Sequence, residues 1–142
     1  MVNYATRKVI VIVDDEPSYA GLMAQLLTDG LDCPVAAFTS PLDALAALPS
    51  LDVGAVVTDF SMPKLNGLEF VTQAEPMLPG TPFIVATGHT VGFPMESFAR
   101  IPAVKTVLRK PVGWRKLAEE ILRVWPDATN MPTLKPEMAS LI

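Results

Sequence analysis

Acidic residues stand directly after two of the most apolar stretches of this 142-residue chain. Asp14 and Asp15 follow the run 9–13, and Asp59 follows the run 53–57 after one threonine. Carboxylates are ligands for a hard cation such as Mg²⁺, which accepts one or two of them and keeps several waters. A carboxylate can also attack a phosphoryl group and form an acyl phosphate. These residues therefore point to metal-dependent phosphoryl chemistry.

Two further groups follow apolar stretches and could stabilise a phosphoryl group during transfer. Thr87 follows the run 83–86 with a hydroxyl, and Lys110 comes shortly after the run 104–108 with an ammonium group. Cations and hydrogen-bond donors around the equatorial oxygens stabilise a transferring phosphoryl group. Because Asp59 stands alone at the end of the central apolar run, it is the best-placed nucleophile of the set.

Solvated loop residues are the alternative interpretation of the acidic side chains. Any one of them, taken singly, could be simply exposed to water. Glu16, the next residue after the acidic pair, suits either a place near a metal or the start of a helix at Pro17. Carboxylates gathered beside apolar strands repel each other unless a cation compensates them. The joint pattern therefore favours a cation site.

The elements that position these groups are predicted from the pattern of apolar residues. Three β-branched runs lie at 9–13, 53–57 and 83–86, and weaker runs lie at 35–38 and 104–108. Residues that are apolar at consecutive positions are typical of strands covered on both faces, as in a parallel sheet.

Apolar residues at helical spacing separate these runs. The clearest amphipathic patterns lie at 19–27 and 114–125, and shorter helices are expected at about 41–48, 67–75 and 95–100. Five strands alternating with five helices predict a (βα)₅ α/β domain, doubly wound around a parallel five-stranded sheet. Ligands of such folds bind outside the carboxyl ends of the strands, where the acidic residues, the threonine and the lysine fall.

The composition is that of one folded domain. Half of the residues are hydrophobic and 18% are charged, which excludes a disordered chain. No apolar run approaches the roughly 18 residues of a membrane span. The single cysteine, Cys33, suits a reducing cytoplasm, and the net charge of −4 argues against direct nucleic-acid binding. Residues 1–125 are expected to form the domain, and residues 126–142 a proline-containing tail without a core of its own.

The ordered set of motifs resembles the receiver domain of two-component response regulators, over roughly residues 7–125. The matching elements are Asp14-Asp15, Asp59 with Met62-Pro63 and Asn66-Gly67, Thr87-Gly88, and Lys110-Pro111. Each element alone occurs by chance in many proteins. All of them in this order, at the ends of predicted strands, make a strong signal.

The resemblance implies a flavodoxin-like, CheY-like fold with the strand order 2-1-3-4-5. It implies that Asp59 is the phosphoacceptor and that Asp15 and Asp59 bind Mg²⁺ directly. By the same resemblance, Asp14 would act mainly through a metal-bound water, and the backbone carbonyl of Ser61 would be a further ligand.

Two more residues would complete the site by resemblance. Thr87 would hydrogen-bond the phosphoryl group, and Lys110 would pair with that group or with the carboxylate. The Lys110–Pro111 peptide bond is expected to be cis, as in the family. Ser61 and His89 stand two positions after the acceptor and the threonine, and would influence the lifetime of the acyl phosphate by controlling the access of water.

The resemblance also implies partners. A sensor histidine kinase or a histidine phosphotransfer protein would donate the phosphoryl group, and an unknown protein effector would receive the signal. The residues after 125 are too few for an output domain, so we expect a stand-alone, cytoplasmic regulator that is not inserted in a membrane. It would catalyse only its own Mg²⁺-dependent phosphorylation and dephosphorylation, and pairing into a homodimer stays open.

Two departures from the receiver pattern keep a second hypothesis open. Receivers usually carry Tyr or Phe three residues before the lysine, where this chain has Val107, and the glycines and prolines of 89–104 predict a short, irregular helix. Both lie on the signalling surface, and they leave open, as the alternative, a receiver-fold module that binds a partner without phosphorylation. An aspartyl phosphatase is disfavoured, because such enzymes usually carry a second Asp where this chain has Ser61.

Overall fold

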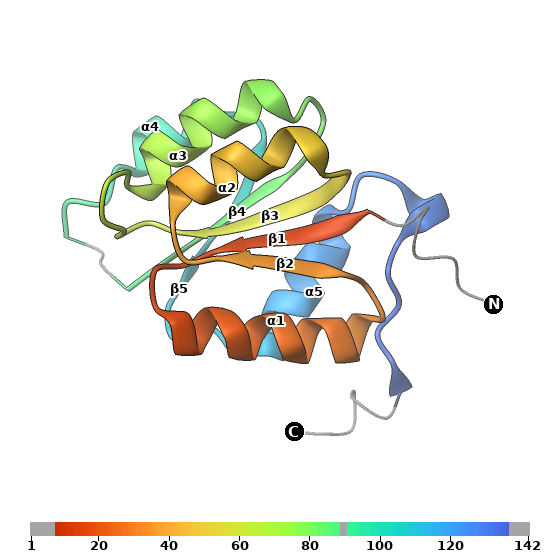
Figure 1. The fold of residues 1–142 in the computed structure, drawn as a ribbon. Helices are drawn as coiled ribbons and strands as arrows, with labels where there is room; N and C mark the ends of the chain where they lie inside the picture. Colours follow the sequence, from red (N-terminus) through yellow and green to blue (C-terminus); the bar gives the residue numbers. More distant parts are fainter. Residues whose placement is uncertain (1–7, 89–90, 137–142) are drawn as a thin grey trace.

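Five strands form one all-parallel sheet in the computed structural model, which describes residues 8–88 and 91–136 (Figure 1). The strand order β2-β1-β3-β4-β5 confirms the prediction. The strands are β1 (Val9–Val13), β2 (Val35–Phe38), β3 (Val53–Asp59), β4 (Phe83–Thr87) and β5 (Val104–Arg109). The helices are α1 (Pro17–Leu31), α2 (Pro41–Ala47), α3 (Gly67–Ala74), α4 (Met95–Ala99) and α5 (Trp114–Val124). Short 3₁₀ turns follow α2 (η2, Leu48–Ser50), α3 (η3, Glu75–Met77) and α5 (η4, Ala128–Asn130).

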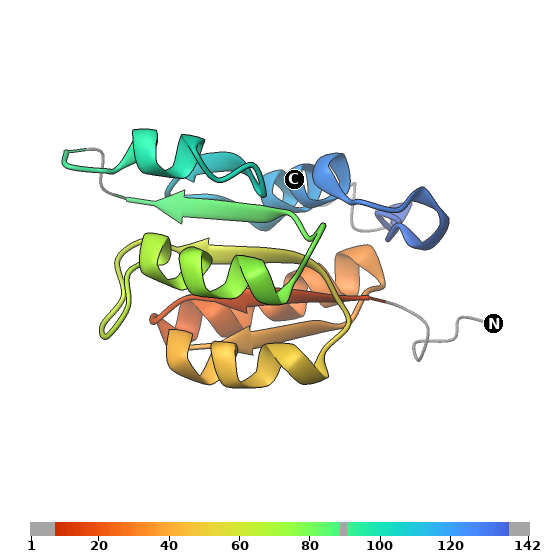
Figure 2. The same ribbon diagram turned by 90° about the horizontal axis from the view of Figure 1, so that it is seen from above.

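Helices cover both faces of the sheet. α1 and α5 lie on one face, and α2, α3 and α4 lie on the other, with α2 and α4 near opposite edges (Figure 2). Alternate residues of β1 enter the two layers: Ile10 and Ile12 pack with α1 and α5, whereas Val11 and Val13 pack with α2 to α4. Burial on both faces explains why the strand is apolar at every position. Within the described residues, no helix is both long and apolar enough to cross a membrane.

Side-chain caps fix the starts of three helices near the carboxyl edge of the sheet. Glu16 caps α1 by accepting a hydrogen bond from the Ser18 amide at 3.0 Å. Of the two roles predicted for it, a place near a metal or the start of a helix, the structure shows the helix start. Ser40 caps α2. Asn66 and Glu69 form a reciprocal capping box at α3, in which each side chain accepts from the other residue's amide at 2.9 Å. These caps hold the loops that follow β1, β2 and β3.

The fourth helix is as short as the sequence predicts. α4 has five residues and starts after Pro94, with no side-chain cap among the described residues. Gly92 adopts a φ of 75°, a left-handed conformation that favours glycine. His89 lies outside the described residues, so its predicted role stays a prediction.

The segment after α5 returns along the domain towards the end of α1 (Figure 1). Trp125 is buried, and its Nε1 donates a hydrogen bond to Asn130 Oδ1 at 2.9 Å. Leu134 packs against the α1–α5 layer, and the Lys135 amide donates to the Gly30 carbonyl at 2.7 Å. The segment therefore packs against the core of the domain.

Candidate phosphoacceptor and metal site

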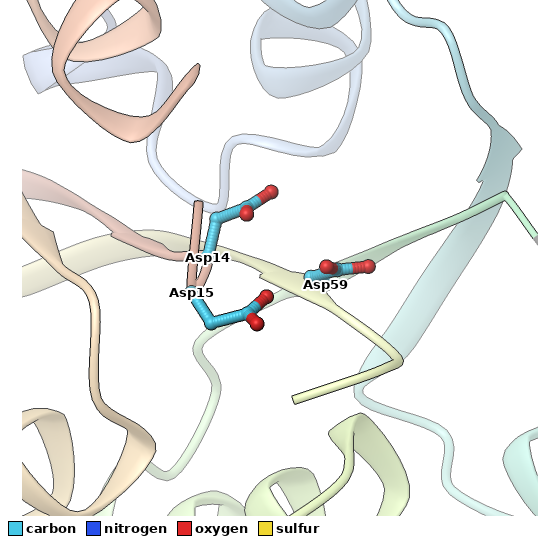
Figure 3. Close-up of side chains that lie close together, drawn as sticks. All are labelled: Asp14, Asp15 and Asp59. Atoms are coloured by element: carbon cyan, nitrogen blue, oxygen red, sulfur yellow. The ribbon is translucent and has the colours of Figure 1, made fainter. Parts of the chain in front are cut away.

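Three aspartates meet at the carboxyl edge of the sheet (Figure 3). Asp14 and Asp15 directly follow β1, and Asp59 ends the neighbouring strand β3. One carboxylate oxygen from each lies within 4.8 Å of the others. Asp14 is buried, Asp59 partly buried and Asp15 exposed. Hard oxygen ligands gathered around one point, with one side open to water, fit the preferences of Mg²⁺.

Lys110 bridges two of the aspartates. Its Nζ lies 2.6 Å from Asp14 Oδ2 and 3.4 Å from Asp59 Oδ2. The Lys110 amide donates to the Thr87 carbonyl at 2.8 Å, which ties the loop after β5 to the end of β4. The peptide bond to Pro111 is cis, as expected. The shorter of the two ammonium contacts is made to Asp14, a preference that the resemblance did not imply.

Hydrogen bonds occupy the carboxylates unequally. Asp14 accepts from the Glu16 amide at 3.0 Å through Oδ1, while its Oδ2 is held by Lys110. Asp59 accepts from the Phe60 amide at 2.8 Å through Oδ1, and among the described residues its Oδ2 has only the longer contact with Lys110. Of the four carboxylate oxygens of Asp14 and Asp59, Asp59 Oδ2 therefore has the longest contact and is the least engaged.

The charges of the site shift the pKa values of its groups. Burial and the nearby charge of Asp14 raise the pKa of Asp59, although Lys110 and the Phe60 amide act in the opposite direction. Burial would lower the pKa of Lys110, but the hydrogen bond to Asp14 and the charges of Asp59 and Asp14 outweigh it and raise that pKa. Three carboxyl groups face one ammonium group here, and a divalent cation would neutralise the negative charge that the lysine leaves uncompensated.

The remaining predicted residues lie at or after the ends of β3 and β4. Thr87 ends β4 and is buried, one position beyond the Ala86 that pairs with Asp59 across the strands. Ser61 is exposed in the loop after β3. The roles of Thr87, Ser61 and the individual metal ligands stay predictions.

Tyr19, which its spacing in the sequence predicts only as part of a helix face, also belongs to the site. Lys110 Nζ lies 4.6 Å from the centre of its ring, and its hydroxyl donates to the Val112 carbonyl at 3.2 Å. A cation over an aromatic face is attracted by the ring quadrupole. The tyrosine therefore helps to hold Lys110 towards the aspartates, and its place in the first turn after the acidic pair was the only sequence signal for this.

Gly67 allows the backbone after Asp59 to fold back tightly. Its amide donates to the Phe60 carbonyl at 2.7 Å, and a Cβ at Gly67 would lie 2.6 Å from the Asp59 carbonyl oxygen. That oxygen belongs to the backbone of β3 and cannot move aside without displacing the strand end.

We expect Gly67→Ala to lower the free energy of unfolding by roughly 1–3 kcal/mol, the usual cost of overpacking. Urea denaturation would measure it. Gly21→Ala is the matched control, because a Cβ at this exposed position in α1 would meet nothing within 4 Å. That change should instead stabilise by about 0.4–1 kcal/mol. Equal stability of the two variants would contradict the close approach at Gly67.

Solved structures share this fold. The CheY-like receiver domain protein from Methanospirillum hungatei aligns with a TM-score of 0.74 and 25% identity, over 82% of this chain and 91% of that chain. A Vibrio cholerae chemotaxis protein, CheY4, aligns with a TM-score of 0.74 and 23% identity, over 84% of this chain and 99% of that chain, and shows the fold alone. The structure is thus that of a CheY-like, flavodoxin-like domain.

The family follows from the sequence comparison. The response regulator receiver domain matches residues 10–122, and the chain belongs to this family of signalling phosphoacceptors. A response regulator receiver protein from Anaeromyxobacter is 35% identical over 72% of this chain and 42% of its own length. The transcriptional regulatory protein FixJ of Bradyrhizobium diazoefficiens is 32% identical over 59% of this chain and 40% of its own length. The chain therefore spans less than half the length of these relatives.

Proposed function

We propose that Asp59 accepts a phosphoryl group from a phosphohistidine, carried by a sensor histidine kinase or a histidine phosphotransfer protein. The proposal rests on the position of Asp59 Oδ2, which lies 3.4 Å from Lys110 Nζ within the three-aspartate cluster. A nucleophile there has a cation beside it and two further carboxylates able to bind a metal.

The transfer exchanges one covalent bond for another. Asp59 Oδ2 attacks phosphorus, the bond from phosphorus to the donor's imidazole nitrogen breaks, and the electron pair of that bond returns to the ring. The product is an acyl phosphate on Asp59 and a free histidine. Lys110 would compensate the charge gained at Asp59, and the Thr87 hydroxyl would donate to a phosphoryl oxygen.

The donor set fits Mg²⁺. Asp15 and Asp59 would bind it directly, with Asp14 acting through water and the Ser61 carbonyl as a further ligand. When bound, the cation supplies charge neutralisation at the phosphoryl oxygens.

The signal is proposed to leave through protein contacts. The phosphorylated form would favour one of two conformations and thereby change the affinity for a protein effector. Stand-alone action, a cytoplasmic location and homodimer formation stay predictions. The short α4 and Val107 favour a second candidate, a receiver-fold module that binds its partner without phosphorylation.

Incubation with Mg²⁺ and acetyl phosphate tests the proposal. Intact-protein mass spectrometry should show an increase of about 80 Da, one phosphoryl group on a carboxylate. EDTA should prevent the increase, because the acidic cluster then lacks its cation. A folded protein that gains no mass with Mg²⁺ present would overturn the proposal. Equal effector affinity with and without the phosphodonor would favour the second candidate.

A further inference from the structure

An open groove lies where receivers usually carry an aromatic side chain. Val107 of β5 lines a groove of about 330 Å³ between α4 and β5, together with Phe98 and Met95 of α4. Because valine has no ring to rotate, a change at Asp59 cannot reach this groove through an aromatic side chain at position 107. Another connection between acceptor and groove is needed if phosphorylation alters this surface.

Three phenylalanines lie between the acceptor and the groove, and we call them the phenylalanine cluster: Phe60, Phe93 and Phe98. The ring centres of Phe60 and Phe93 are 4.9 Å apart in an edge-to-face arrangement, and those of Phe93 and Phe98 are 5.3 Å apart and stacked. Phe60 and Phe98 are 6.1 Å apart. The cluster is continuous from the residue after Asp59 to the wall of the groove.

The acceptor end of the cluster is tied to the Asp59 carboxylate. The Phe60 amide donates to Asp59 Oδ1 at 2.8 Å and to the Ala86 carbonyl at 3.1 Å. A carboxylate that gains a phosphoryl group changes its charge and its hydrogen-bonding, so this amide must readjust. The Gly67 amide also holds the Phe60 carbonyl at 2.7 Å, so a change at the Asp59 carboxylate acts on Phe60, the residue that carries the first ring of the cluster.

The groove end of the cluster belongs to a weakly held helix. α4 spans five residues, and Phe98 is its one buried residue, at 2% exposure. Phe93 stacks on that ring from just before the helix. Short elements with few buried contacts are the ones that change conformation at low cost. A displacement of the two rings would therefore move α4 against β5 and reshape the groove.

We propose that the phenylalanine cluster couples Asp59 to α4 and the α4–β5 groove, in place of an aromatic residue at position 107. This inference rests on the proposed phosphorylation of Asp59. Packed rings exchange between discrete arrangements, which suits a two-state element that a change at the acceptor can bias. Phe60 and Phe93 act here as positioning residues, because neither is required for the attack on phosphorus.

Hydrogen exchange of the full chain tests the coupling, with Mg²⁺ and acetyl phosphate as phosphodonor. In the wild type, peptides covering 93–101 should change their exchange on phosphorylation. In Phe60→Leu and in Phe93→Leu the adduct should still form, while this change should fall at least about threefold, because the ring contacts are lost. Phe38→Leu is the matched control: it is a partly buried phenylalanine of β2 outside the cluster, and should keep the wild-type response.

The double variant Phe60→Leu/Phe93→Leu gives a second readout. If the rings act as one unit, it should lose little more of the response than either single variant. Variants that carry the adduct and respond like the wild type would overturn the coupling alone. A wild type that forms no adduct would overturn the proposed phosphorylation and the coupling with it.

Discussion

Asp59→Asn should take up no phosphoryl group from acetyl phosphate and Mg²⁺, while the domain stays folded. The amide is nearly isosteric with the carboxylate, and its oxygen can still accept the Phe60 amide that now lies 2.8 Å from Asp59 Oδ1. It is not a nucleophile towards phosphorus, and it offers the metal a weaker ligand. The mass increase of about 80 Da expected for the wild type should therefore be absent.

A control separates the acceptor from acidic residues in general. Asp29→Asn changes an exposed aspartate near the end of α1 and should leave the adduct at its wild-type level. An adduct that persists in Asp59→Asn would remove Asp59 as the acceptor. Thermal unfolding of both variants would show that any loss of phosphorylation does not come from loss of the fold.

The same substitution should raise the melting temperature in metal-free buffer at neutral pH. Burial and the charge of Asp14 raise the pKa of Asp59, so its ionised form is disfavoured in the folded state. Asparagine resembles the neutral form and avoids that penalty. The advantage over the wild type should be present above the raised pKa, shrink as the pH falls through it, and vanish below about pH 4, where unfolded aspartate is also protonated. A variant that melts below the wild type at neutral pH would contradict this reasoning.

The sheet was predictable because its strands are apolar on both faces. The run 9–13 matches β1, but β3 extends beyond 57 to include Thr58 and Asp59. Thr58 is fully buried, and its hydroxyl donates to the Asp59 carbonyl at 2.9 Å. A polar residue can occupy a core strand once its hydrogen bond is made, and a pattern of apolar residues cannot report that bond.

The gathering of the site residues was predictable, whereas their individual contacts were not. Parallel strands bring Asp14, Asp59 and Lys110 to one edge of the sheet whatever their separation in sequence. Lys110 lies closer to Asp14 than to Asp59, and its Nζ lies over the ring of Tyr19. These contacts depend on side-chain packing between α1 and the loop after β5. No local spacing encodes such a contact.

The contact of Trp125 also had little local signal. Helical spacing placed it on the apolar face of α5, but its ring lies over Gly54 in β3, far away in the sequence. A Cβ at Gly54 would come within 2.2 Å of the ring. A glycine inside a strand often marks a close approach of another group, so Gly54 itself was the only hint.

Trp125→Ala should cost about 3–5 kcal/mol of unfolding free energy, the usual loss for a buried large aromatic. The ring is 7% exposed and fills the space above Gly54, and its Nε1 holds Asn130 at 2.9 Å. Urea denaturation would measure the loss. Asn130→Ala removes only the hydrogen bond and should cost about 1 kcal/mol. The difference between the two variants isolates the packing of the ring.

The Trp125 experiment also bears on where the folded unit ends. The ring lies over Gly54, near the amino-terminal end of β3, whereas Asp59 lies at the carboxyl end of the same strand. The folded fraction of Trp125→Ala should therefore still form the acyl phosphate, because the site residues keep their own contacts. A loss of several kcal/mol, together with a measurable cost for Asn130→Ala, would extend the folded unit past residue 125, the boundary expected from the sequence. If both variants unfold within about 0.5 kcal/mol of the wild type, the range of ordinary surface changes, the segment after α5 contributes nothing to the domain.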